Sequence, residues 1–129
     1  MPENSHSPRW IDGGTAVVTV PSEIDVVNAD EVSDGLIAVI DGGAHSVIAD
    51  MSATGFCDSA GVKAMVRAYR HARAQSCVLR LVVTSAAVRR VFSLTGVDRL
   101  VPVCASMDEA VSALSKPAPS RPAPSDPAP

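Results

Sequence analysis

Short apolar runs alternate along this chain with stretches in which apolar residues recur at helical spacing. Residues 46–50 and 78–84 are such runs, and their length and content are typical of buried strands. Aromatic residues make up only 3% of the chain, so its core has to be built from Val, Ala, Leu and Ile. The 129 residues are enough for one core and too few for two. We therefore expect a single α/β domain.

The chain opens with a predicted hairpin over residues 9–20. Its turn sequence at 12–14, Asp-Gly-Gly, lies between two short extended runs and can supply the positive φ that a tight turn needs. The run 15–20 is the more regular strand, and Pro21 then ends the ladder. Trp10 is either an exposed anchor or a cover for the edge of the sheet, and burial is the favoured interpretation.

A first helix is predicted to follow this hairpin. Asn28 is expected to act as its N-cap with Glu31 three residues later, and apolar residues then recur at helical spacing to about Asp41. Gly42 and Gly43 end the helix before the buried strand 46–50.

A second helix is predicted to begin at Asp58 or Ser59. Apolar residues at i, i+3, i+4 and i+7 mark its inner side, and basic residues mark its outer side. The apolar stripe is Val62, Met65, Val66 and Tyr69, and the basic residues are Lys63, Arg67 and Arg70.

Two further helices follow the strand 78–84. Ser85 is predicted to cap the third helix, and Gly96 has the position of a left-handed C-terminal residue. A short last strand is expected at 100–104, before a capping box of Ser106 and Glu109 starts the fourth helix. The predicted order is ββαβαβαβα, a small mixed and mainly parallel sheet covered by helices.

Charge and hydropathy exclude two classes of partner. A net charge of -3 provides no cationic field for nucleic acid. No apolar run approaches the ~20 residues that a membrane span needs. The polar segment 1–9 lacks the order of a signal peptide, so a cytoplasmic location is predicted.

Three cysteines, Cys57, Cys77 and Cys104, lie in otherwise apolar stretches without C-x-x-C spacing. They are interpreted as reduced and mostly buried thiols. The sequence places no histidine beside any of them, and no metal site, cofactor or catalytic residue is predicted.

The composition changes after Ser115, where proline occupies nearly every second position. Residues 116–129 are therefore predicted to be a disordered Pro/Ala/Ser-rich tail, residues 9–115 the folded domain, and residues 1–8 a flexible N-terminus. A solvated tail is the simpler interpretation, although its P-x-x-P spacings would also suit a proline-reading domain.

The start of the second helix is the most informative segment. It follows a buried strand and a loop, the place where α/β proteins position their sites. Ser59 would lie at a helix N-terminus, which favours added negative charge. Asp58 and Ser59 are also ordinary capping residues, and the small residues Ala60 and Gly61 leave the first turn open to close approach. Both interpretations, a simple cap and a site, stay open here.

The segment from Asp58 to Gly61, Asp-Ser-Ala-Gly, resembles the phosphorylation motif of the STAS-domain anti-sigma factor antagonists. The resemblance runs from Thr15 to about Leu114. It includes Glu23-Ile24-Asp25, Asp50 at the end of the central strand, Leu94-Thr95-Gly96-Val97 and Asp108-Glu109-Ala110. One departure is Ser22, where the family commonly has glycine.

The resemblance implies a STAS-like fold and a cycle of partner switching. The unmodified antagonist binds an anti-sigma factor and so frees a sigma factor for transcription, in stress responses for example. The anti-sigma factor is usually a serine kinase that uses Mg-ATP and phosphorylates the antagonist, here at Ser59, and a phosphatase reverses this. A phosphate placed in a packed interface costs binding energy, so modification should release the partner.

The resemblance also implies which residues meet the partner. Asp58 would orient the Ser59 hydroxyl, cap the helix or help hold the metal of the bound kinase. The expected partner-binding residues are Glu23, Asp25, Asn28, Asp58, Ala60, Gly61, Val62 and Lys63.

Three other functions would each require a different feature of the sequence. A phosphoaspartate receiver would use Asp50, but no acidic pair follows the first strand. An enzyme with Ser59 as nucleophile would need a G-x-S-x-G elbow or a nearby base, and the sequence shows neither. The alternative within the same fold is a STAS scaffold subunit of a larger signalling or lipid-transport complex, in which Ser59 is not phosphorylated.

Overall fold

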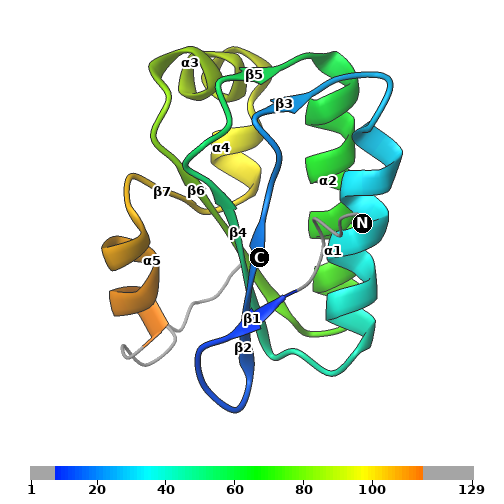
Figure 1. The fold of residues 1–129 in the computed structure, drawn as a ribbon, viewed down its shortest axis with the longest axis vertical. Helices are drawn as coiled ribbons and strands as arrows, with labels where there is room; N and C mark the ends of the chain where they lie inside the picture. Colours follow the sequence, from blue (N-terminus) through cyan, green and yellow to red (C-terminus); the bar gives the residue numbers. More distant parts are fainter. Residues whose placement is uncertain (1–7, 115–129) are drawn as a thin grey trace, which may run out of the picture.

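The computed structural model describes residues 8–114, which form a five-stranded sheet with helices on both faces (Figure 1). The strand order is β1-β2-β4-β6-β7, with β1 antiparallel to β2 and every other pair parallel. The predicted hairpin and the mainly parallel sheet are therefore confirmed. The bounds are Arg9–Trp10 for β1, Thr15–Thr19 for β2, Ser46–Met51 for β4, Val78–Val83 for β6 and Val103–Cys104 for β7. The segments predicted to be flexible, 1–8 and 116–129, lie outside the described residues except for Pro8.

Five helices connect and cover these strands: α1 (Ala29–Asp41), α2 (Ser59–Ala74), α3 (Ala86–Thr95), α4 (Val97–Leu100) and α5 (Met107–Leu114). The Ser85 hydroxyl accepts a hydrogen bond from the Val88 amide, and Gly96 has φ +84°, as the sequence predicted for the two ends of α3. The short α4 was not predicted. Val97 and Val101 are both buried, and a helical turn brings both to the core, so the strand expected at 100–104 shrinks to β7.

The predicted side-chain cap at the start of α1 does not form. Asn28 has the N-cap position, but its side chain makes no capping hydrogen bond. Its Oδ1 instead accepts from the Asp25 amide at 3.0 Å, and its Nδ2 donates to the Glu23 carbonyl at 2.8 Å. The Asp25 carbonyl accepts from the Ala29 amide at 2.8 Å. The side-chain carboxamide of Asn28 thus stabilises the loop before α1. The hydrogen bond at the helix start is accepted by the backbone carbonyl of Asp25 instead.

The main core lies between the sheet and α1, α2, α3 and α4. Helix α2 enters it through Met65 and small residues, so the predicted stripe is confirmed as the core-facing side of the helix, with Met65 as its one fully buried member. Val62, Val66 and Tyr69 are only partly buried and pack at the margin. Small residues let α2 lie close to the sheet and to α1, which pushes the larger side chains to the sides. The buried residues of α2 are Gly61, Ala64, Met65, Ala68 and Ala72.

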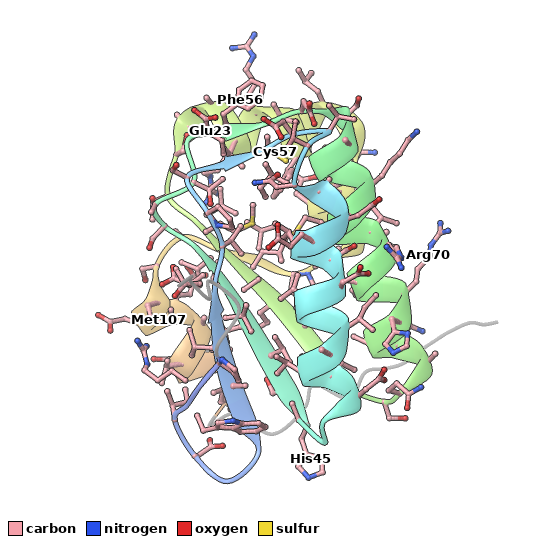
Figure 2. All side chains as sticks on the ribbon, turned by 45° about the vertical axis from the view of Figure 1, so that its right-hand side comes forward. Glu23, His45, Phe56, Cys57, Arg70 and Met107 are labelled. Carbon is pink, nitrogen blue, oxygen red and sulfur yellow. The ribbon has the colours of Figure 1, made fainter. Side chains whose placement is uncertain are left out.

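A second, smaller core lies on the opposite face of the sheet. Val17, Ile48, Val82 and Cys104 pack there against Ala110 of α5. Figure 2 shows Met107, at the start of α5, far from Arg70 of α2, with the sheet between them. Helices α1 to α4 thus cover one face of the sheet, and α5, a helix of eight residues, covers the other.

Trp10 is 48% exposed, so its predicted burial was wrong, because β1 is a two-residue edge strand. The three cysteines are buried and unpaired, as predicted. No helix within residues 8–114 is both long and apolar enough to cross a bilayer.

Candidate functional site

A second sheet of two short strands, β3 (Glu23–Ile24) and β5 (Phe56–Cys57), forms the frame of the candidate site. The strands are parallel, with Glu23 opposite Phe56 and Ile24 opposite Cys57. They lie beyond the carboxyl end of the main sheet, at the top of Figure 1. Sequence patterns did not reveal them, because two residues are too few to show a period. This pairing brings the loop before α1 next to the start of α2.

Hydrogen bonds outside the strands lock the same two segments together. The Asp58 amide donates to the Ile24 carbonyl at 3.1 Å, and the Gly55 amide donates to the Ser22 carbonyl at 2.9 Å. The buried Thr54 hydroxyl donates to the Pro21 carbonyl at 2.7 Å. Ser22 therefore takes part through its backbone carbonyl. The geometry of one segment depends on the other.

Asp58 caps α2. Its Oδ1 accepts hydrogen bonds from the amides of Ala60 at 2.9 Å and Gly61 at 3.1 Å. Of the three roles expected for Asp58, the helix cap is the one that this geometry displays. Ser59 is the first residue of the helix and is exposed. Its hydroxyl is thus presented at the positive end of the α2 dipole, on a backbone fixed by the cap.

Gly61 has a packing role that the sequence did not indicate. A Cβ at this position would lie 2.6 Å from Cys57 Sγ and 3.0 Å from Ile24 Cγ2. The glycine is buried, so it faces the two-stranded sheet and not a partner. The expectation of an open first turn holds for Ser59 and in part for Ala60, whereas Gly61 allows α2 to approach β3 and β5.

The loop before α1 presents two apolar side chains to solvent. Asp25 Oδ1 accepts from the amides of Val27 at 2.9 Å and Asn28 at 3.4 Å, so Asp25 and Asn28 both brace the turn. Val26 and Val27 consequently point outward and are 78% and 89% exposed. Neither was predicted as a site residue, although two valines in a loop that follows no helix or strand period were a possible signal.

Phe56 is another exposed apolar side chain at this end of the molecule. Its ring is half exposed, and Figure 2 shows it beside Glu23 at the same end of the molecule. Val26, Val27 and Phe56, together with Ser59, are named the switch surface below. Phe56 was not predicted as a site residue either.

A groove between α1 and α2 adjoins the switch surface. It has a volume of about 190 Å³, and Val26 and Ala60 line one end while Lys63 and Arg67 line the other. Arg67 Nη1 donates to the Ser33 hydroxyl at 3.0 Å, and Nη2 lies 3.2 Å from an Asp34 oxygen. The predicted basic side of α2 is therefore exposed, with Arg67 partly engaged by α1.

The Cys57 thiol of β5 is buried beside the start of α2. Burial raises the pKa of the Cys57 thiol to about 11, and the nearby Asp58 carboxylate adds to this, so the thiol is uncharged at neutral pH. Across the described residues, no group of three or more His, Cys, Asp or Glu side chains is arranged to hold a metal ion. A larger hollow of about 560 Å³ lies on α3 and α4, and it shares no lining residue with the switch surface or its groove.

Comparison with known proteins gives a consistent result. Residues 10–110 match the STAS domain family. A crystal structure of an anti-sigma factor antagonist from Mycobacterium paratuberculosis is 27% identical, with a TM-score of 0.74, and the match covers 89% of this chain and 100% of that one. No curated protein matches the sequence at a significant level.

Two further structures share the fold. SpoIIAA, a Bacillus cell fate determinant solved in a phosphorylated form, is 21% identical with a TM-score of 0.63, and the match covers 84% of this chain and 97% of that one. A murine anion transporter of Solute Carrier family 26 is 26% identical with a TM-score of 0.64. That match covers 77% of this chain but only 17% of the transporter.

Proposed function

The chain belongs to the STAS domain family, and on that premise we propose that it is a non-enzymatic anti-sigma factor antagonist switched at Ser59. In its unmodified form it binds an anti-sigma factor that is also a serine kinase, which frees a sigma factor for transcription in the cytoplasm. The kinase phosphorylates Ser59 and so ends the complex, and a phosphatase restores the binding form. The likeness to the mycobacterial antagonist supports this assignment.

One observation carries the proposal: an exposed serine stands at the capped start of α2, next to a loop that exposes two valines. Val26 lines a groove with Ala60, the residue after Ser59, so the two segments border each other directly. Exposed apolar side chains gathered at one place mark a surface that a partner covers. A partner that covers Val26 and the groove beside Ala60 would also reach the Ser59 hydroxyl.

Phosphorylation would act differently on the free protein and on the complex. A phosphate adds roughly -1.5 to -2 charges. In the free chain these charges face water and the positive end of the α2 dipole, so the fold tolerates them. In the complex they would have to be desolvated against an apolar surface, which costs binding energy. The modification should therefore release the partner without unfolding the antagonist.

The structure refines the roles proposed for the binding residues. Glu23, Ala60, Val62 and Lys63 are at least partly exposed and can contact a partner directly. Asp25, Asn28 and Asp58 would act mainly by holding the loop and the helix start in place. Gly61 would act by packing alone.

The test combines mass measurement with binding. The protein is isolated from its own cells before and after stress, and its intact mass and modified site are determined beside a Ser59→Ala variant. One phosphoryl group at Ser59, absent from the variant, is the expected result. Purified Ser59→Asp should then lose affinity for the kinase partner at least tenfold, whereas Ser93→Asp, at an exposed serine of α3, should not.

A second function has one observation in its favour. The fold also occurs as a small part of an anion transporter, so a STAS domain can serve within a larger assembly. In that case the chain would be a constant binding module for a signalling or transport complex. Absence of phosphate at Ser59 under all conditions, with binding unchanged in Ser59→Asp, would reject the switch in favour of this module.

A further inference from the structure

The sheet face under α5 is incompletely covered. Within residues 8–114, the side chains that pack on its core of Val17, Ile48, Val82 and Cys104 all come from α5. Ile11 and Val111 at the margin of this face are 37% and 41% exposed. Exposed aliphatic side chains beside a half-covered sheet indicate that something further packs there.

A groove of about 460 Å³ marks the place. It lies between the β1–β2 turn and α5, and it is lined by Ile11, Asp12, Val111 and Leu114. Three of these four side chains are aliphatic, and the fourth is a carboxylate. The β1–β2 turn that borders the groove lies at the opposite end of the sheet from β3 and β5 (Figure 1).

The Asp12 carboxylate is fixed in place. Its Oδ1 accepts hydrogen bonds from the amides of Gly14 at 2.8 Å and Thr15 at 2.7 Å. The bond from Gly14 in particular lowers the pKa of Asp12, so the group is charged at neutral pH. A cationic side chain would complement this end of the groove.

The chain itself supplies such a side chain close by. Leu114 lines the groove and is the last described residue, and residues 115–129 continue directly from it. This segment holds six prolines, three alanines, Lys116 and Arg121, with Asp126 as its one acidic residue. An extended proline-rich chain rises ~3.1 Å per residue, so 15 residues span about 45 Å and reach well beyond the groove.

We propose that residues 115–129 fold back across the groove, with proline and alanine side chains over Ile11 and Val111 and a basic side chain against Asp12. A proline-rich strand suits an aliphatic groove, because it is already extended and loses little entropy on docking. The tether at Leu114 keeps its local concentration high. The docked segment would shield this face from a second copy of the chain.

Backbone amide order parameters of Ser120 and Arg121 in the isotope-labelled full chain test the proposal. Docking predicts values above ~0.6, the level below which a backbone counts as flexible. Val111→Glu places a charge in the groove and keeps good helix propensity, so these values should fall while the fold, followed by circular dichroism, persists. Leu94→Glu is the matched control, because Leu94 is 77% exposed on α3.

Asp12→Asn examines the charge separately. Asparagine keeps the oxygen that accepts from Gly14 and Thr15, so only the ionic contact is lost, and the order parameters should fall part of the way. Flexible values in the unaltered chain overturn the proposal. High order parameters that neither groove variant lowers also overturn it, because the segment would then be ordered elsewhere. Order parameters that rise with protein concentration overturn it as well, because a second copy of the chain would then occupy the groove.

Discussion

The backbone carbonyl of Ile24 accepts a hydrogen bond of 3.1 Å from the amide of Asp58, the residue that caps α2. Through this bond the loop before α1 and the start of α2 form one unit. The position of Ser59 therefore depends on residues more than thirty positions earlier in the chain.

Gly61→Ala should destabilise the fold. The new methyl group would lie 2.6 Å from Cys57 Sγ and 3.0 Å from Ile24 Cγ2, and such overpacking costs roughly 1–3 kcal/mol. The free energy of unfolding in urea measures this. Gly55→Ala is the matched control, because nothing lies within 4 Å of its Cβ position. Equal stability of the two variants would show that the Gly61 contact is unimportant.

Asp58→Ala should also lower the free energy of unfolding, by about 0.5–2 kcal/mol, because two amides of α2 lose their acceptor. Asp58→Asn should lose much less, since an amide oxygen caps a helix almost as well. Urea unfolding of both variants compares them. If the two lost equally, the charge of Asp58 and not its capping oxygen would be the stabilising feature.

Val27→Asp should weaken partner binding at least tenfold, or about 1.4 kcal/mol, and leave stability unchanged. Val27 is 89% exposed, so the free protein loses no packing, whereas the complex would have to bury the new charge. Leu94→Asp, at an exposed apolar residue of α3, serves as the control in the same binding titration. Equal loss in both variants would remove the switch surface from the interface.

The Cys57 thiol should contribute a pH-dependent stabilisation. Its pKa is raised from 9.0 to about 11, by burial first and by Asp58 second, so folding favours the uncharged thiol. That contribution is complete below pH 9 and is lost as the pH rises through about 11. The difference in unfolding free energy between the wild type and Cys57→Ala should therefore shrink over this range. A constant difference would contradict the assignment.

Local sequence signals determined most of the regular structure. Ser85 and Gly96 define the ends of α3, and Asp58 the start of α2, because capping and left-handed backbone depend on a few neighbouring residues. The buried runs 46–50 and 78–84 specified the central strands by composition alone. The motif around Ser59 also led directly to the family.

The errors occurred where distant segments meet. Asn28 had the residue type of a cap, yet its amide braces the loop instead. Val62 and Val66 face the core, as their spacing predicted, yet the buried residues of α2 are small ones apart from Met65. Trp10 had the chemistry of a buried residue, but a two-residue edge strand leaves it exposed.

The sequence by itself determined the order of the main strands and helices, the family and the position of Ser59 at a helix start. Only the tertiary structure decided that Val26 lies beside Ala60, next to this serine, and that Gly61 packs against Ile24 and Cys57. These relationships come from the pairing of β3 with β5, two strands of two residues that are far apart in the chain. Helix signals are local in sequence, whereas strand pairing and surface neighbourhoods arise from contacts that no local period encodes.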